Sequence, residues 1–161
     1  MVIVLTGVSG SGKTTVGRQL AAELDWPFRD ADEFHPPANI ARMTAGRPLT
    51  EGDRAPWLAA IRAYVDDCLA RGQNAVVTCS ALRESHRRAL LSDPARVKLV
   101  CLDGDEAILR GRLARRQGHF MKEAMLASQR ATFEAPSHAL VLDVALTPAQ
   151  LVTGIRRAFS V

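Results

Sequence analysis

A glycine-rich run near the start of the chain constrains its fold more than any other stretch. Residues 7–14 read GVSGSGKT and fit the pattern G-x-x-x-x-G-K-[ST] of a phosphate-binding loop. In such a loop the glycines let successive backbone N–H groups turn toward one hollow, where a polyphosphate sits at the start of the following helix. Lys13 is therefore predicted to reach the β and γ phosphates, and the Thr14 hydroxyl to bind Mg²⁺.

The sequence on both sides of the run supports this interpretation. Residues 2–5, Val-Ile-Val-Leu, form a short apolar stretch typical of a buried parallel strand. After the loop, apolar residues recur at helical spacing, namely Val16, Leu20, Ala21 and Leu24. Strand, loop and helix follow in the required order, which disfavours the alternative of a glycine-rich turn that binds nothing.

Length and composition indicate one domain over residues 1–161. Hydrophobic residues make up 47% of the chain, and no apolar run approaches the roughly 20 residues of a membrane span. The first strand is expected from residue 2, which leaves no room for a signal peptide and favours a cytoplasmic location.

The widely spaced Cys68, Cys79 and Cys101 are interpreted as reduced, mostly buried thiols. The net charge of +4 suits either nucleic acid binding or anionic substrates.

Apolar runs and helical periodicity alternate along the chain. Strands are expected at residues 2–6, 27–30, 75–79, 97–102 and 139–143. Helices are expected at residues 13–24, 38–44, 53–71, 82–91, 105–117, 122–133 and 148–159, with Asp53 and Thr147 as N-caps. The alternation predicts an α/β fold: a five-stranded parallel sheet with helices on both faces and ligands beyond the carboxyl ends of the strands. Residues 31–52 and 117–137 are expected to be a substrate-binding insert and a mobile lid.

Two aspartates, Asp30 and Asp32, follow the second expected strand. Alternation along a strand would point both side chains toward the site above the sheet. Phosphoryl transfer to a hydroxyl needs Mg²⁺ and a carboxylate that accepts the hydroxyl proton, and the two aspartates could divide these roles. Aspartates are also common in turns, so the spacing alone leaves that interpretation open.

The chain carries further short motifs as far as about residue 136. After the phosphate loop these are Asp30-Ala31-Asp32, His35-Pro36 with Asn39 and Met43, Gly46-Arg47-Pro48-Leu49, Asp53-Arg54-Ala55-Pro56-Trp57-Leu58, Cys79-Ser80-Ala81-Leu82, Arg112-Leu113, Gly118-His119-Phe120, and Ser128-Gln129 with Glu134. Together they resemble the gluconate kinases of the small P-loop kinase superfamily. The chain departs from that pattern at Ala31, where Gly is usual, and at Arg130, where an aromatic residue is common.

The resemblance implies a P-loop kinase fold and the ATP-dependent phosphorylation of D-gluconate to 6-phospho-D-gluconate with Mg²⁺. It implies that Asp32 contacts the substrate hydroxyl and acts as the base, while Asp30 and Thr14 hold the Mg²⁺ shell. A sugar acid offers a carboxylate and several hydroxyls, which Arg, His, Asn and Asp side chains can bind. The expected substrate-binding residues are Asp32, His35, Asn39, Arg54, Arg83, Arg87 and His119.

Several of these residues have simpler alternatives. His35 could cap the helix that follows it, and Arg83 and Arg87 could be solvated surface charges. Trp57 is interpreted as packing and not as a sugar platform. For His119, a hinge position or a nucleotide contact also remains open.

A group of arginines precedes Gly118. Arg112 and Arg116 are four residues apart and share a helix face, which in this superfamily belongs to the lid and neutralises the transferring phosphoryl group. Arg115 points elsewhere and is expected to be solvated. The expected catalytic residues are Lys13, Asp32 and Arg116, and the expected nucleotide-binding residues are Gly7, Val8, Ser9, Gly10, Ser11, Gly12, Lys13, Thr14, Thr15, Arg112 and Arg116. Likeness to the fold places the adenine pocket near residues 143–148.

Two other functions remain as alternatives. One is a kinase of the same fold for another small acid or polyol such as shikimate, which the His-Pro and Asp-Arg-x-Pro-Trp segments disfavour. The other is a nucleic-acid-associated P-loop module, favoured only by the basic composition and disfavoured by the lack of aromatic residues among the arginines. No nucleic acid or membrane partner is therefore expected, and the resemblance implies a homodimer.

Overall fold

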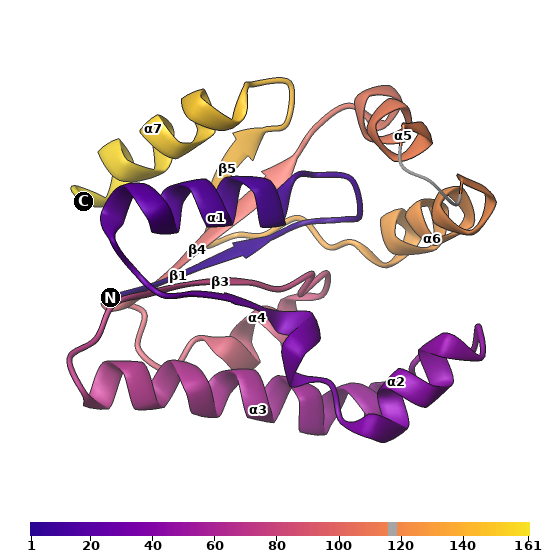
Figure 1. Ribbon diagram of the computed structural model, residues 1–161, viewed down its shortest axis with the longest axis horizontal. Helices are drawn as coiled ribbons and strands as arrows, with labels where there is room; N and C mark the ends of the chain where they lie inside the picture. The colour runs from indigo at the N-terminus through magenta and orange to yellow at the C-terminus, as the bar shows by residue number, and fades with distance from the viewer. Residues whose placement is uncertain (116–118) are drawn as a thin grey trace.

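The computed structural model describes the backbone of residues 1–115 and 119–161 and the side chains of residues 1–115 and 125–161 (Figure 1). These residues contain a five-stranded sheet in the order β2-β3-β1-β4-β5, in which every neighbouring pair is parallel. The strands are β1 (Val2–Thr6), β2 (Phe28–Asp30), β3 (Ala75–Thr78), β4 (Val97–Asp103) and β5 (Leu140–Asp143). The parallel sheet expected from the sequence is confirmed, and each strand lies within one residue of its expected bounds.

The apolar sequence of β1 follows from its central place in the sheet. β3 pairs with it on one side and β4 on the other, and every residue of β1 is buried. Because side chains alternate along a strand, Val2 and Val4 point into a core on one face, while Ile3 and Leu5 point into a second core on the opposite face. A strand covered on both faces is apolar throughout, which explains the unbroken run in the sequence.

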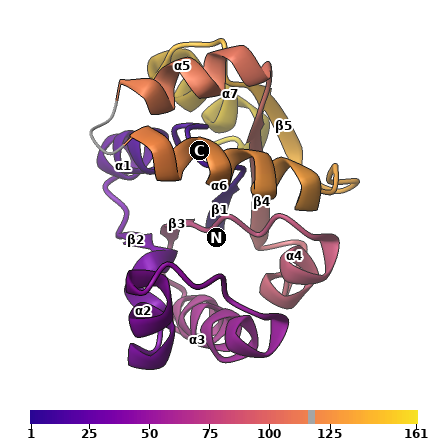
Figure 2. The same ribbon diagram turned by 90° about the vertical axis from the view of Figure 1, so that its right-hand side faces the viewer.

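Helices cover both faces of the sheet. α1 (Lys13–Leu24) and α7 (Pro148–Phe159) pack together on one face, and α3 (Glu51–Ala70) and α4 (Glu84–Leu90) pack together on the other (Figure 1). The remaining helices are η1 (Ala31–Phe34), α2 (Pro37–Thr44), α5 (Glu106–Ala114) and α6 (His119–Thr132). Figures 1 and 2 place α2, α5 and α6 at the end of the sheet toward which the strands point, with α6 and α2 on opposite sides of the strand ends.

The start of α3 differs from the expectation. The helix begins at Glu51, and Thr50 is its N-cap. The Thr50 hydroxyl accepts a hydrogen bond from the Asp53 backbone N–H at 3.2 Å, and the Asp53 carboxylate accepts one from the Thr50 backbone N–H at 2.8 Å. Asp53 is thus the third helical residue of a capping box, and its assignment as N-cap was wrong. At α7, Thr147 is the N-cap as expected.

The helices after β4 also differ in their bounds. α5 ends at Ala114, before the expected end at residue 117, and α6 begins at His119, before the expected start at residue 122. The expected helix break at Gly118 lies outside the described residues. In the described part of the chain, no helix combines the length and the apolar character needed to cross a membrane.

Candidate active site

The loop between β1 and α1 has a backbone conformation that glycine adopts far more readily than other residues. Gly7 has φ of 138°, and a Cβ at this position would collide with the carbonyl oxygen of Leu102 on β4. Gly12, with φ of 93°, is the N-cap of α1, whose first turn carries no acidic side chain. The N–H groups of that turn therefore favour an anion. Lys13 Nζ lies across the loop and donates to the carbonyl oxygens of Gly7 and Val8 at 2.9 and 3.0 Å.

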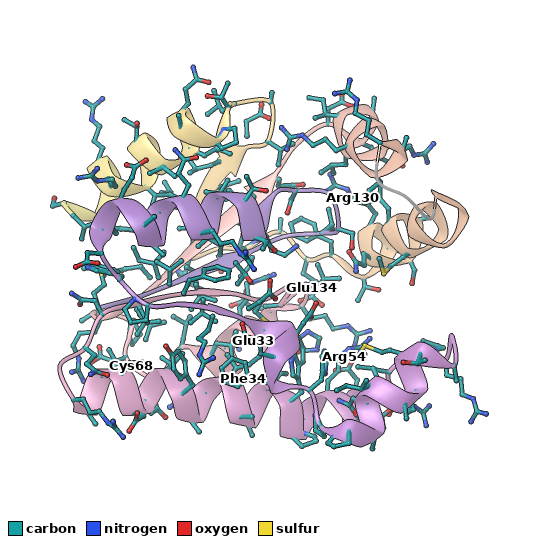
Figure 3. The ribbon with its side chains drawn as sticks, in the orientation of Figure 1. Glu33, Phe34, Arg54, Cys68, Arg130 and Glu134 are labelled. Carbon is teal, nitrogen blue, oxygen red and sulfur yellow. The ribbon has the colours of Figure 1, made fainter. Side chains whose placement is uncertain are left out.

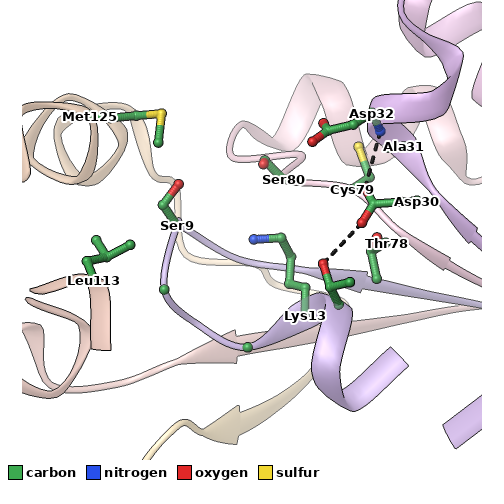
Figure 4. A pocket seen from close by; sticks show the side chains of 13 residues that line it. Ser9, Lys13, Asp30, Ala31, Asp32, Thr78, Cys79, Ser80, Leu113 and Met125 are labelled. Atoms are coloured by element: carbon green, nitrogen blue, oxygen red, sulfur yellow. Dashed lines mark hydrogen bonds between the residues drawn. The ribbon is translucent and has the colours of Figure 1, made fainter. Parts of the chain in front are cut away.

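A cavity of about 190 Å³, here called the loop cavity, lies over this segment (Figure 4). Lys13 and Thr14 line it from α1, and Asp30 and Asp32 line it from the other side. The Thr14 hydroxyl donates to Asp30 Oδ2 at 3.0 Å. Hydroxyl and carboxylate oxygens are ligands that Mg²⁺ prefers, so the pair fits a magnesium site. The described residues contain no cluster of three or more His, Cys, Asp or Glu that could hold a metal by itself.

A turn brings the two aspartates together. Asp30 ends β2 and caps η1, where its carboxylate accepts a hydrogen bond from the Asp32 backbone N–H at 3.2 Å. Asp32 lies in the first turn of η1, so the expectation that strand alternation aims both side chains was wrong, although both line the loop cavity. The Asp32 side chain is 90% exposed, but nearby protein atoms desolvate it in part, and this effect, followed by the charge of Asp30, raises its pKa. A carboxylate with a raised pKa is a better proton acceptor near neutral pH.

A second cavity of about 330 Å³, here called the side cavity, adjoins the loop cavity. The two share the lining residues Ser9, Asp32, Ser80 and Met125. The polar and aromatic side chains that line only the side cavity include His35, Arg54, Trp57, His86 and Gln129. Asp32 therefore lies where a molecule in the side cavity would meet a phosphate group over the loop.

Stacking holds His35 in the wall of the side cavity. Its ring lies almost parallel to that of Trp57, with centroids 4.5 Å apart and an angle of 10° between the planes. Trp57 Nε1 donates to the Ala31 carbonyl oxygen at 2.7 Å, which fixes the indole against η1. The buried Asn39 has its Nδ2 3.4 Å from His35 Nδ1 and donates to the Asp53 carbonyl oxygen at 2.8 Å. Burial lowers the pKa of His35, so its ring is neutral at pH 7.

These contacts refine three expectations. His35 does not cap α2, because the N-cap of that helix is Pro36, and no side chain makes a capping hydrogen bond there. Trp57 packs in the core, as expected, but it also lines the side cavity. Asn39 was expected to contact the substrate, yet it does not line the side cavity. Its amide instead contacts the Nδ1 atom of His35.

A charged cluster borders this cavity through Arg54, which is labelled in Figure 3, and through His86, whereas its other members, Glu51 and Arg83, do not line the cavity. Arg54 Nη1 lies 2.7 Å from Glu51 Oε1, and Arg83 Nη1 lies 3.6 Å from the same oxygen. His86 Nε2 lies 2.9 Å from Glu51 Oε2, and its hydrogen bond lowers the pKa of Glu51. Sequence reasoning missed Glu51 and His86. The three-residue spacing of Glu51 and Arg54 could have signalled the first, but His86 joins through a tertiary contact that no local pattern reveals.

Arg87 is a correction to the predicted substrate-binding set. Its side chain is only 1% exposed. The guanidinium donates to the carbonyl oxygens of Ala81, Leu82 and Glu134 and to the Glu84 carboxylate, at distances of 2.9–3.1 Å. These bonds occupy all its N–H directions, so Arg87 anchors α4 and does not contact the cavity.

A third cavity, here called the α7 cavity, has a volume of about 360 Å³ and lies on the other side of the loop. Its lining includes Gly12, Thr15, Arg112, Arg115, Leu146 and Pro148. It overlaps the region of residues 143–148 where the adenine pocket was expected. Arg115 is exposed, as expected, but it lines this cavity beside Arg112, so the expectation that it points away from Arg112 was wrong. The side chains of Arg116 and His119 lie outside the described residues, and their roles stay predictions.

Cys79 follows β3 beside the loop cavity. Burial raises the pKa of its thiol to about 12, so it stays protonated at neutral pH. The sequence interpretation of Cys79 as a buried thiol is confirmed, and Cys68 and Cys101 are likewise buried and not in disulfides.

Two comparisons with known protein sequences bear on the family of this chain. The family model described as "AAA domain" matches residues 2–136. The gluconokinase of Gluconobacter oxydans (strain 621H) is 47% identical over 134 residues, which covers 83% of this chain and 75% of that protein.

Solved structures agree with this result. A gluconokinase from Sinorhizobium meliloti 1021 superposes with a TM-score of 0.87 at 41% identity, covering 99% of this chain and 91% of the other. A shikimate kinase from Aquifex aeolicus vf5 reaches a TM-score of 0.63 at 19% identity, with 99% and 96% covered, and this likeness shows the fold alone. With its parallel sheet and phosphate loop, the chain belongs to the gluconokinase family of P-loop kinases.

Proposed function

We infer that this chain is a gluconokinase, which transfers the γ-phosphoryl group of ATP to the 6-hydroxyl of D-gluconate. The products are ADP and 6-phospho-D-gluconate. The observation that carries the inference is that Asp32 lines both the loop cavity and the side cavity. Relatives named gluconokinase support gluconate as the acceptor, whereas the likeness to shikimate kinase extends to the fold alone.

On the nucleotide side, we propose that residues 7–15 bind the phosphates at the start of α1 through backbone N–H groups other than those of Gly7, Ser9 and Ser11, which donate to Ser80, Gln129 and Val8. Lys13 neutralises charge on the β and γ phosphates, and Arg112 contacts the nucleotide from α5. The α7 cavity binds the adenine ring of ATP. Thr14 and Asp30 hold the Mg²⁺, which when bound offsets negative charge on the β and γ phosphates.

At the junction of the cavities, Asp32 accepts the proton of the 6-hydroxyl while the hydroxyl oxygen attacks the γ phosphorus. The new oxygen–phosphorus bond forms as the bond from the γ phosphorus to the β–γ bridging oxygen breaks, and that oxygen leaves with ADP. The raised pKa of Asp32 favours this proton transfer. We propose that Arg116 stabilises the charge on the transferring group together with Lys13.

On the acceptor side, the substrate carboxylate pairs with the positive charge of Arg54 and Arg83, beside His86. His35, neutral and fixed by its stack, hydrogen-bonds a hydroxyl. His119 remains a proposed substrate contact. A homodimer also remains a proposal, which sedimentation equilibrium of the purified chain would test.

The test of this function is ADP release by the wild-type protein with gluconate, glucose, shikimate, RNA or DNA. Gluconate should exceed glucose by roughly 10²-fold in kcat/KM, because a neutral sugar offers no carboxylate to the guanidinium groups of Arg54 and Arg83. Comparable turnover of glucose and gluconate would rule out the assignment. Stimulation by nucleic acid without stimulation by gluconate would favour the nucleic-acid alternative.

A further inference from the structure

One hydrogen bond joins the phosphate loop to a distant helix. The backbone N–H of Ser9 donates to Oε1 of Gln129 at 2.6 Å, across 120 residues of sequence. Ser9 lines both the loop cavity and the side cavity, and Gln129 on α6 lines the side cavity. The Ser9 N–H of the phosphate loop is therefore bonded to a side chain that lines the side cavity, where the acceptor is proposed to bind.

The end of α6 that carries Gln129 is itself anchored to the sheet. Arg130 Nη1 pairs with Asp103 Oδ1 at 2.6 Å, and its Nη2 donates to the Gly104 carbonyl oxygen at 2.6 Å, both at the end of β4. The following segment is tied to the chain before α4, because the Glu134 backbone N–H donates to the Leu82 carbonyl oxygen at 2.9 Å. These bonds hold the Gln129 side chain at a defined distance from the loop.

The Gln129 amide has a second bonding group. Because an N–H donor needs an oxygen acceptor, Oε1 is the atom that faces Ser9, and the Nε2 group keeps two donors. Among the described residues, Nε2 of Gln129 has no hydrogen-bond partner. A polyhydroxy acceptor in the side cavity offers oxygens for such donors.

We propose that Gln129 is a positioning residue that couples the acceptor to the nucleotide. Its Nε2 donates to an acceptor hydroxyl while its Oε1 holds the Ser9 N–H. An acceptor bound to Nε2 fixes the amide, which in turn fixes the phosphate loop, so each substrate strengthens binding of the other by the same factor. The inference rests on the proposed function, since it takes a sugar acid as the occupant of the side cavity.

The test measures binding of a non-hydrolysable ATP analogue with and without saturating gluconate, by calorimetry. Gluconate should tighten analogue binding to the wild-type protein by about fivefold or more. Two variants test the role of the amide: Gln129→Ala removes it, and Gln129→Met removes it but keeps the length of the side chain. In both variants gluconate should leave the affinity for the analogue nearly unchanged. Both should also raise the KM for gluconate by about tenfold, as expected for one lost hydrogen bond. The matched control is Gln19→Ala on α1, where the Gln19 amide bonds only to the exposed Glu23, and it should retain the full factor.

The outcomes separate this inference from the proposed function. Wild-type turnover of gluconate tests the function by itself. An active wild-type protein in which gluconate does not tighten analogue binding, or in which both Gln129 variants keep the wild-type factor, overturns the role of Gln129 and leaves the function standing. Loss of thermal stability without loss of coupling would likewise overturn it, since it would show a purely structural contact.

Discussion

The Thr14 hydroxyl donates a hydrogen bond of 3.0 Å to the Asp30 carboxylate, which joins the first turn of α1 to the end of β2. β2 is an edge strand, separated from β1 by β3. The bond therefore connects the central phosphate loop with the periphery of the sheet. Because Asp30 also caps η1, the same residue sets the position of Asp32. The proposed metal ligands and the proposed base thus depend on one turn.

Asp30→Asn should raise the Mg²⁺ concentration for half-maximal activity by about 10- to 100-fold. The amide oxygen of Asn can still cap η1, but it carries no charge for the ion. Titration of Mg²⁺ in an ADP-release assay measures the effect, and Asp67→Asn at an exposed ion pair on α3 is the control. An unchanged Mg²⁺ dependence with a large loss of kcat would mean that Asp30 is the base.

Asp32→Asn should lower kcat by roughly 10²- to 10⁴-fold, because the variant has no group that accepts the hydroxyl proton. Binding of an ATP analogue should change little, since Asp32 is proposed to act on the acceptor hydroxyl and not to contact the phosphates in the ground state. Steady-state kinetics and calorimetry separate the two effects. A variant that keeps near-normal kcat would remove Asp32 from the mechanism.

The raised pKa of Asp32 has a second consequence, for stability. Folding raises this pKa, so the folded state binds the proton more tightly than the unfolded state. The charged carboxylate then destabilises the fold at pH values above the folded pKa, and the effect disappears below the unfolded pKa. Because solvent screens the charge of a side chain that is 90% exposed, Asp32→Asn should unfold at only a slightly higher temperature than the wild-type protein at pH 7, and the difference should vanish in acid. A lower Tm for the variant at pH 7 would show that the charged Asp32 carboxylate stabilises the fold, contrary to this prediction.

Lys13→Ala should abolish turnover and leave the fold intact. The variant loses the charge proposed to act on the β and γ phosphates, while the bonds lost to the Gly7 and Val8 carbonyl oxygens are local to the loop and join no distant elements. Activity and far-ultraviolet circular dichroism provide the measurement. Near-normal activity would mean that the loop is not the phosphate site.

Arg54 and Arg87 should respond in opposite ways to replacement by Ala. Arg54→Ala should raise the KM for gluconate by about 10- to 100-fold and narrow the preference over glucose, with little change in stability. Arg87→Ala should lower the free energy of unfolding by at least about 2 kcal/mol, because it leaves buried carbonyl groups unpaired. Urea unfolding and kinetics on both variants test the contrast, with Arg71→Ala at an exposed pair as the control. A stable Arg87 variant with a raised KM would restore Arg87 to the substrate site.

The proposed lid, residues 117–137, should show slower hydrogen exchange when an ATP analogue and gluconate are both bound. The reason is that Met125 and Gln129 of this segment line the side cavity. Mass spectrometry of peptides from the segment would measure it, with peptides of α7 as an internal reference. Equal exchange with and without ligands would argue against a lid that closes.

Local patterns predicted the sheet because each strand carries its own signal. The buried β1 is apolar throughout, and its loop has a fixed spacing of glycines, so residues 2–14 were predictable without any tertiary information. The resemblance to gluconate kinases likewise pointed to Asp30, Asp32, His35 and Arg54, and all of them line one of the two adjoining cavities.

Side chains whose roles depend on distant partners could not be predicted in the same way. Arg87 has helical spacing from Arg83 and the charge expected of a substrate ligand, yet the carbonyl oxygen of Glu134, 47 residues away, helps to bind it inside the protein. His86 meets Glu51 across 35 residues. Such contacts depend on how α3, α4 and the segment after α6 pack, and no periodicity along the chain records that.

The division of the site between two cavities has a consequence for how such a protein can change. The segment joining β1 to α1 and the first residues of α1 line one side of the loop cavity, whereas the side cavity is lined by residues of η1, α2, α3, α4 and α6. Among the described residues, Ser9, Asp32, Ser80 and Met125 line both. Substitutions elsewhere in the side cavity can therefore alter the accepted alcohol while the machinery for the phosphoryl donor stays intact. Descendants of one ancestral gene could acquire new substrates on this scaffold without first losing their catalytic step.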